Sequence, residues 1–320
     1  MFHVKHQREG GRGLDRTQGK GKRRWRIVLL VLLAFVLLAS YMALEADVVR
    51  VEYADVYLTD LPEAFSGTRI LFLSDLHVSN LYAPDKTAAL VEQLQALKPD
   101  LLLLGGDYSA LDIVDYARAL TGGTPLPEAK RVLSARRDQF FLMIRSFQAP
   151  LGKYAVPGNH DYELDDLDDL DQAVALGGLT LLQNTGKVLS RGGQKLILSG
   201  LDDWKAGEQD IEKIASAVRG SDCVVLLSHN PDALPSVVSQ PSVDEKPWAD
   251  LVLSGHTHGG QVALFGQGLF ASSIYGNRYL SGWYEDGDSL LLVSNGVGGY
   301  MLPLRLGAPP QAHLITLYKK

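Results

Sequence analysis

Several short apolar runs in this chain end in the same kinds of polar residue, and this repetition constrains the fold more than any other feature. Each run has the length and composition of a fully buried strand, and each is followed by Gly, Asp, Asn or His. The polar residues therefore lie at the carboxyl ends of strands, where α/β sheets build their sites. The five runs are Arg69–Leu73, Leu101–Leu104, Tyr154–Val156, Val224–Leu227 and Leu251–Leu253.

Five of the eight histidines follow these runs, which would need repeated coincidence if they were ordinary core or surface residues. Asp75 and His77 are two residues apart, which would place both side chains on one side of an extended backbone. The same spacing separates His256 from His258. Together the strand ends offer seven nitrogen or oxygen ligands: Asp75, His77, Asp107, Asn159, His229, His256 and His258. Seven ligands without a thiolate are too many for one ion and suit two, about 3.5–4 Å apart with one bridging carboxylate.

The stretch 156–161, Val-Pro-Gly-Asn-His-Asp, combines three different polar side chains after one strand. The amide of Asn159 can ligate a hard metal, the imidazole of His160 can transfer a proton, and the carboxylate of Asp161 can orient that imidazole. Alone, such a stretch is more often a simple polar loop. The matching residues at the other strand ends favour a catalytic role.

A dinuclear centre of this kind lowers the pKa of a bridging water, so that hydroxide is available near neutral pH, and it binds the oxygens of a phosphoryl group. Mixed histidine and carboxylate ligands suit two divalent ions of Mn, Zn or Fe, and the sequence does not choose among them. A metallopeptidase is a poorer interpretation, because the chain has no His-Glu-x-x-His helix.

The N-terminal part of the chain predicts a membrane anchor. Residues 27–44 contain no charge, and as a helix they would extend roughly 27 Å, close to the hydrocarbon thickness of a bilayer. A secretory signal peptide is the main alternative, but no clear small-x-small cleavage site follows. Residues 1–26 form a basic head with a net charge of +7, whose first twenty residues we expect to be disordered. The positive-inside rule then places the N-terminus in the cytoplasm and the later domain on the outer side.

The remainder of the chain is acidic. The formal charge of the protein is −6, so the residues after the basic head carry −13. We therefore expect no nucleic-acid partner, since such proteins present a basic surface. The single cysteine, Cys223, lies in an apolar run and excludes both an internal disulfide and a cysteine-based zinc site.

Residues 45–320 are predicted to form one catalytic domain that mixes helices with strands. Alternation and apolar runs predict further strands at 48–58, 179–183, 188–190, 196–200, 289–294 and 313–318. We expect the three strands between 179 and 200 to be antiparallel. Amphipathic patterns predict helices at 84–97, 111–121, 128–148 and 210–218.

The order and spacing of these polar motifs resemble the five-motif signature of the calcineurin-like metallophosphoesterases over about residues 68–320. The resemblance implies an α+β fold, a four-layer α/β/β/α sandwich with the metal site at the strand ends. It assigns Asp75, His77, Asp107 and His258 to one ion, and Asp107, Asn159, His229 and His256 to the other. His160 would then contact the scissile phosphate and protonate the leaving oxygen, with Asp161 orienting it.

The N-terminal anchor and the segment Ser254–Gln261 resemble a membrane-associated bacterial branch of that family. The resemblance implies a dimetal phosphodiesterase whose phosphoester substrate is a lipid or is linked to one. Two alternatives stay open: a UDP-diacylglucosamine-type pyrophosphatase, and a catalytically inactive scaffold tethered to the membrane. Arg305, Trp204 and the segment 111–148 are candidates for the wall of the substrate pocket.

Overall fold

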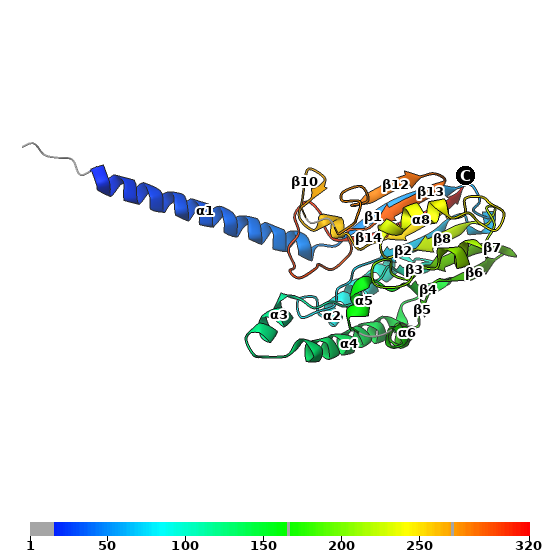
Figure 1. Cartoon of the computed structure of the whole chain (residues 1–320), viewed down its shortest axis with the longest axis horizontal. Coiled ribbons are helices and arrows are strands. Elements are labelled where there is room, and N and C mark those ends of the chain that lie inside the picture. Colours follow the sequence, from blue (N-terminus) through cyan, green and yellow to red (C-terminus); the bar gives the residue numbers. More distant parts are fainter. Residues whose placement is uncertain (1–15, 165–166, 270–271) are drawn as a thin grey trace, which may run out of the picture. The chain divides into compact units, whose positions relative to one another are not determined.

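The computed structural model describes residues 16–164, 167–269 and 272–320, and it separates the chain into two compact units, Met1–Tyr41 and Met42–Lys320. The second unit contains two six-stranded sheets and the helices around them (Figure 1). The first sheet has the order β1 (Arg50–Leu58), β14 (Gln311–Lys319), β2 (Thr68–Leu73), β3 (Leu101–Leu104), β4 (Gly152–Ala155) and β5 (Thr180–Leu181).

Strands β2 to β5 are parallel to one another, so the carboxyl ends of β2, β3 and β4 meet at one edge of the first sheet. The remaining two strands complete this sheet on the other side of β2. Strand β14 pairs antiparallel with β2 and parallel with β1. The C-terminal strand thus lies inside the sheet, between two strands from the beginning of the domain.

The second sheet has the order β12 (Gly282–Asp286), β13 (Ser289–Val293), β9 (Leu251–Ser254), β8 (Val224–Leu227), β7 (Gln194–Gly200) and β6 (Thr185–Arg191). Its central strands β7, β8, β9 and β13 are parallel, and the outer strands β6 and β12 are antiparallel to their neighbours. The chain changes sheets between β5 and β6. The expectation of three antiparallel strands was therefore wrong for β5, which pairs parallel with β4.

Each buried strand has one face toward the other sheet and one toward helices, which explains the uninterrupted apolar runs. In β2, Ile70 and Phe72 pack in the core between the sheets, whereas Leu71 and Leu73 pack in a second core with helices. That second core contains side chains of α2 (Pro84–Leu94), α4 (Leu126–Met143) and α6 (Leu167–Leu176). In Figure 1 these three helices lie together below the sheets.

The second sheet is covered in the same way. Val225 and Leu227 of β8 face the first sheet, and Val224 and Leu226 pack against α7 (Ile211–Ala215) and α8 (Leu234–Ser239). The order helices, sheet, sheet, helices confirms the predicted four-layer α/β/β/α sandwich. Two short helices, α3 (Ile113–Leu120) and α5 (Asn159–Leu164), and the two-stranded pair β10 (Ala263–Leu264) and β11 (Gln267–Gly268) complete the unit.

Helix α1 (Arg16–Asp47) includes a 25-residue stretch, Arg23–Asp47, that is long and apolar enough to cross a membrane. A signal sequence can have the same length and composition, so the anchor at 27–44 stays a prediction. The expected disorder of the first twenty residues was wrong for residues 16–20, which are helical. Residues 1–15 of the predicted head lie outside the described residues.

Candidate metal centre

The polar loops of both sheets meet at one place in the second unit. The loops after β2, β3 and β4 come from the first sheet, and those after β8 and β9 come from the second. Backbone hydrogen bonds join the first two of these loops, from Asp75 N to Gly106 O at 3.0 Å and from His77 N to Asp107 O at 3.1 Å. The loops of the second sheet are joined by Gly255 N, which donates to His229 O at 2.9 Å.

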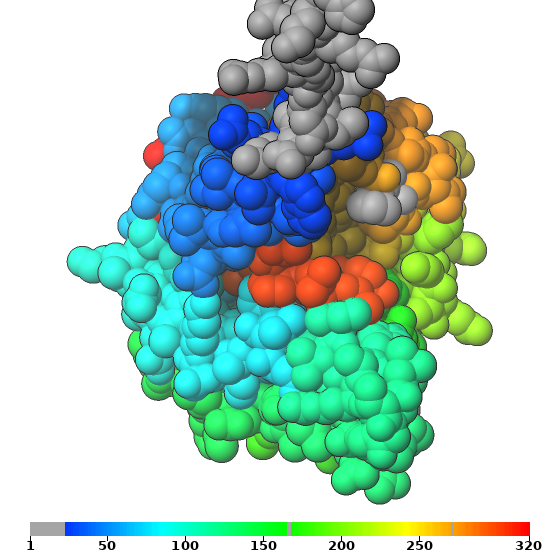
Figure 2. Space-filling view, turned by 90° about the vertical axis from the view of Figure 1, so that its left-hand side faces the viewer, coloured from blue at the N-terminus to red at the C-terminus, as the bar shows by residue number. Residues whose placement is uncertain are grey.

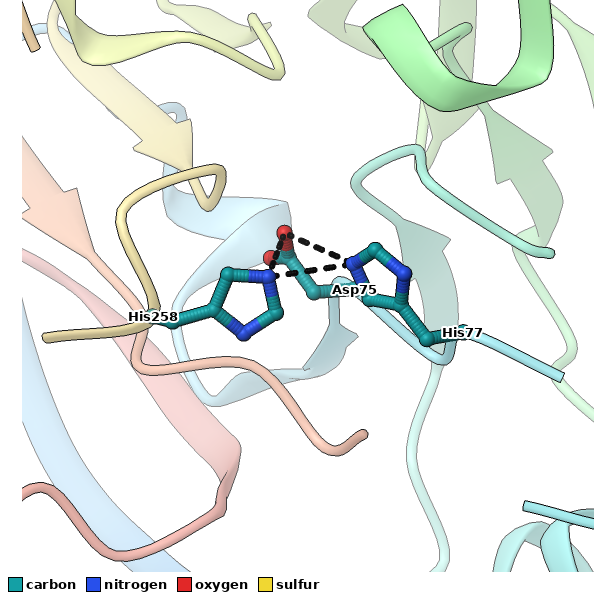
Figure 3. A group of neighbouring side chains, drawn as sticks. All are labelled: Asp75, His77 and His258. Atoms are coloured by element: carbon teal, nitrogen blue, oxygen red, sulfur yellow. Dashed lines mark hydrogen bonds and ion pairs between the residues drawn. The ribbon is translucent and has the colours of Figure 1, made fainter. Parts of the chain in front are cut away.

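One group of possible metal ligands consists of Asp75, His77 and His258 (Figure 3). The Nε2 atoms of the two imidazoles lie only 3.0 Å apart. Asp75 Oδ1 lies 3.5 Å from Nε2 of His258 and 3.9 Å from Nε2 of His77. All three side chains are buried and point toward one another, so their ligand atoms converge on one point.

Asp107, His229 and His256 form a second such group. The carboxylate of Asp107 connects the two, because its Oδ2 lies 3.2 Å from Nε2 of His229 and 3.6 Å from Nε2 of His77. Nδ1 of His229 lies 2.7 Å from the carbonyl oxygen of Gly105. Because Nδ1 donates to that carbonyl, Nε2 is the nitrogen that would bind a metal ion on losing its proton.

The backbone of the ligand loops differs from the sequence-based expectation. Asp75 and His77 have φ angles of 53° and 47°, and His256 and His258 have 69° and 53°, so neither pair lies on an extended segment. Asp107 is also left-handed, with φ of 56°. Such conformations cost roughly 1–3 kcal/mol each and are concentrated at functional sites. These turns, and not strand alternation, bring Asp75 and His77 into one ligand group and place His256 and His258 in different groups.

Glycines allow the ligand loops to approach one another closely. A Cβ atom on Gly158 would lie 2.3 Å from Asp107 Oδ1, and one on Gly255 would lie 2.2 Å from Asp75 Oδ2. Neither position can hold a larger residue without moving a carboxylate of the centre. The glycines of the motifs are thus explained by packing against Asp75 and Asp107.

The chemistry of the donor set fits divalent metal ions. Asn159 Oδ1, His229 Nε2 and His256 Nε2 are buried and have no hydrogen-bond partner. Buried polar atoms without a partner are costly, and a bound cation would satisfy all three. Burial lowers the pKa of His77 and of His256 to about 3, so both imidazoles are neutral at pH 7 and able to bind a metal.

The two carboxylates have different electrostatic environments. Burial raises the pKa of Asp75 to about 6. Burial also disfavours the charge of Asp107, but the neighbouring His229 and His160 hold the pKa of Asp107 well below its usual value. The nearby Asp107 raises the pKa of His229 well above its usual value, although burial disfavours the charged imidazolium. Of these two carboxylates, that of Asp107 is therefore the more readily ionised.

His160 lies at the start of α5, where its backbone N–H donates to Asp107 Oδ1 at 2.8 Å. Nδ1 of its imidazole lies 3.1 Å from Glu163 Oε2, one helical turn further along. The expectation that Asp161 orients this imidazole was wrong. Both carboxylate oxygens of Asp161 instead accept backbone N–H groups, from Asp107 and Gly158 at 2.9 Å each and from Tyr108 at 3.0 Å.

Two neighbours of His160 were not predicted from the sequence. Glu163 could have been found only by starting a helix at Asn159, since the pair is spaced i, i+3. Tyr300 stacks on the imidazole with ring centroids 5.1 Å apart, although it lies 140 positions further along the chain. No local pattern connects these two residues.

A cavity of about 500 Å³ opens beside the centre. Its walls include the ligands Asp107, Asn159, His256 and His258, together with His160, Glu163, Lys205, Gln261, Ser272, Tyr300, Met301 and Leu302. Trp204 packs against the core around α7 and α8 and does not line this cavity, nor does any residue of the segment 111–148. For the described residues, the expectation that Trp204 and the segment 111–148 form the pocket wall was therefore wrong.

Arg305 was also expected in the pocket wall, but it lies completely buried behind His258. One guanidinium nitrogen, Nη1, donates to the carbonyl groups of His258 at 3.2 Å and Ala308 at 2.8 Å. The other, Nη2, donates to the carbonyl groups of Asn295 at 2.7 Å and Gly298, and lies 3.3 Å from His258 Nδ1. Arg305 thus fixes a candidate ligand to the C-terminal loops.

Replacing Arg305 by lysine should destabilise the protein by roughly 2–4 kcal/mol, because an ammonium group cannot serve four carbonyls from one planar fork. The measurement is the free energy of unfolding in denaturant, with metal content determined on the same samples. The control is the Arg278→Lys variant, because Arg278 is exposed and the change there should cost less than about 1 kcal/mol. Equal stability of the two variants would contradict this role for Arg305.

The comparison with known proteins agrees with this geometry. Residues 68–260 match the family model described as calcineurin-like phosphoesterase. The chain is 30% identical over 258 residues to the uncharacterized metallophosphoesterase YkuE of Bacillus subtilis, covering 80% of this chain and 81% of that protein. It is 30% identical over 257 residues to the phosphodiesterase YaeI of Escherichia coli, covering 78% and 82% of the two chains.

A third relative, from Danio rerio, is named a transmembrane protein with metallophosphoesterase domain. It is 26% identical over 318 residues, which cover 96% of this chain but only 65% of the relative. The family match extends over more than half of the chain and includes all seven candidate ligands of the centre, together with His160. The chain therefore belongs to the calcineurin-like phosphoesterase family, and it is a hydrolase that acts on phosphoesters.

Proposed function

We propose that this protein is a membrane-anchored phosphodiesterase that uses two divalent metal ions. The observation that carries the proposal is the position of Asp107, whose Oδ2 lies within 3.6 Å of a histidine from each of the two ligand groups. A carboxylate in that position can contact both ions at once. Although Asp107 is buried, the neighbouring His229 and His160 hold its pKa well below the usual value, so it stays charged for that purpose.

The residues of the chain would have separate roles. Asp75, His77 and His258 would hold one ion, and Asn159, His229 and His256 the other, with Asp107 shared between them. Bound there, the ions would lower the pKa of a water molecule and neutralise the charge of the phosphoryl oxygens. His160 lines the cavity and would give a proton to the leaving oxygen. Glu163 and Tyr300 would hold its imidazole in place.

Metal content tests the two-ion proposal. The wild-type chain should bind about two ions, and the His229→Ala and His258→Ala variants should each retain about one, because each loses a ligand of a different group. The measurement is elemental analysis by mass spectrometry after dialysis. The control is the His160→Ala variant, in which the histidine removed is not assigned to either ion and both ions should remain.

A single ion in the wild-type chain would contradict the proposal. The loss of both ions from the His160→Ala variant would also contradict it, because that histidine would then be a ligand. These results would be read together with the circular dichroism of each variant, so that unfolding is distinguished from the loss of one ligand.

The role of His160 can be tested with leaving groups of different basicity. An alkoxide needs a proton as it departs, whereas a nitrophenolate leaves as a stable anion. Replacing His160 by alanine should therefore lower kcat about 10²–10⁴-fold on an alkyl phosphodiester and only about tenfold on bis(p-nitrophenyl) phosphate. The measurement is steady-state hydrolysis of both substrates by the same preparation.

Equal losses on the two substrates would contradict proton transfer by His160 and would leave it a role in binding the phosphate. No hydrolysis of either diester by the wild-type chain, with both ions bound, would contradict a general phosphodiesterase. It would favour a narrow substrate, such as the pyrophosphate of a nucleotide-linked lipid, or a scaffold without activity.

The anchor is the second part of the proposal. The stretch Arg23–Asp47 has a mean hydropathy of 2.9, and its side chains from Arg23 to Leu38 are exposed. Nine Lys or Arg residues lie within positions 1–26, and on the positive-inside rule they would stay in the cytoplasm. The catalytic unit would then lie on the outer side of the membrane.

Cysteine labelling tests this orientation. The only native thiol, Cys223, is buried, so a cysteine that replaces the exposed Val188 can be labelled alone. In intact spheroplasts, a membrane-impermeant maleimide should react with the Val188→Cys variant. It should react with a Gly10→Cys variant only after lysis. The reverse pattern would place the catalytic unit in the cytoplasm.

A further inference from the structure

The hairpin made by β10 and β11 presents apolar side chains to solvent. Phe265, at its turn, is fully exposed with a left-handed φ of 54°, and Leu264 and Leu269 on either side are also exposed. Leu302, on a neighbouring loop, is exposed as well. We call these four residues, Leu264, Phe265, Leu269 and Leu302, the apolar rim. Exposed apolar side chains on neighbouring segments of this kind are candidates for an interaction site.

The apolar rim is connected to the wall of the metal cavity. Leu302 is itself part of the cavity wall, as are Gly260 and Gln261 at the base of the hairpin. The side chain of Gln261 connects the two segments, since its Nε2 donates to the carbonyl groups of Tyr300 at 3.0 Å and Leu302 at 3.2 Å. In Figure 2, the segment near residue 302 (orange-red) and the segment near residue 275 (orange) are visible on the same face.

The segments that carry the apolar rim contain no charge. There is no Asp, Glu, Lys or Arg between His258 and Arg278, and none between Asp288 and Arg305. By contrast, the chain after residue 26 carries a net charge of −13. Uncharged apolar segments can enter a hydrocarbon phase without the cost of burying a charge.

The same hairpin is tied to the end of the candidate membrane span. Val262 forms a β-bridge with Leu306, and Ala263 N donates to Leu306 O at 2.7 Å. The residues on either side of Leu306 contact α1, because Arg305 N donates to Met42 O at 3.0 Å and Gly307 N to Glu45 Oε2 at 3.3 Å. Met42 and Glu45 belong both to the catalytic unit and to the stretch Arg23–Asp47.

We propose that the apolar rim inserts into the surface of the lipid bilayer that holds α1, so that the metal cavity faces lipid head groups. The substrate would then be a phosphoester carried by a membrane lipid. This inference rests on the anchor in the proposed function. The contact with residues of the span, the absence of charge and the convex turn at Phe265 favour a bilayer over a protein partner, which would need a complementary surface. Tyr300, beside Leu302, has the amphipathic character of residues at membrane interfaces.

Spin labels on the full-length chain in lipid nanodiscs test the insertion. Phe265→Cys and Leu264→Cys variants would each carry one label, because Cys223 is buried. The nanodiscs contain phosphatidylcholine and phosphatidylglycerol. Both labels should collide more often with oxygen, which concentrates in lipid, than with a water-soluble nickel chelate. The control is Val188→Cys, an exposed apolar position on β6, whose label should show the opposite preference.

A preference for the nickel chelate at both hairpin positions would overturn the proposal. Two further results would also overturn it. One is labels that are already immobile when the monomeric protein is in detergent micelles, and the other is dipolar broadening that reports a second copy of the chain. Hydrolysis of bis(p-nitrophenyl) phosphate is measured on the same samples and reports the metal centre. If the diester is hydrolysed but the labels are exposed to water, the insertion alone is refuted. If the labels are in lipid but the wild-type chain does not hydrolyse the diester, the phosphodiesterase alone is refuted.

Discussion

The carboxylate of Asp107 is the group on which the arrangement of this site depends. It is buried, it lies close to histidines from both sheets, and its Oδ1 accepts the backbone N–H of His160. An ionised carboxylate in such a place is stable only where positive charge and hydrogen-bond donors surround it. Asp161 fixes the backbone at this point, because it accepts the N–H groups of both Asp107 and Gly158. The loops after β3 and β4 are therefore held together by one side chain that need not touch a metal or a substrate.

The strained backbone of the ligand loops requires support from the rest of the fold. Five candidate ligands have positive φ, and an isolated loop would relax from such conformations. Hydrogen bonds between loops prevent this, since Asp75 N donates to Gly106 O and Gly298 N donates to Asp75 O at 2.7 Å. These bonds join segments that are parallel neighbours or that come from opposite sheets. The two sheets thus do more than bury apolar surface, because their relative position determines the shape of the ligand loops.

Much of this architecture could be predicted from the sequence, and the limits have physical causes. The buried strands were predicted because they are covered on both faces and so lack polar alternation, as in Leu101–Leu104. The ligands were predictable because polar residues directly follow those strands. The left-handed turns were not, since Asp and His have positive φ more often than most residues but still in only a small fraction of cases. The pairing of Glu163 with His160 depends on a short helix whose apolar pattern is too brief to detect, and Tyr300 reaches the site only through tertiary structure.

Arg305 shows how the C-terminal part of the chain connects the metal centre with the beginning of the domain. Its guanidinium group holds the carbonyl of His258, while its backbone N–H donates to the carbonyl of Met42. Ala46 is buried, and Val49 and Val51 pack on the core that contains α2. Residues 42–51 are consequently part of the folded unit. In the described chain, the end of the candidate span therefore continues into this unit without a flexible linker. Arg305 therefore links the end of the stretch Arg23–Asp47 to the metal centre within one folded unit.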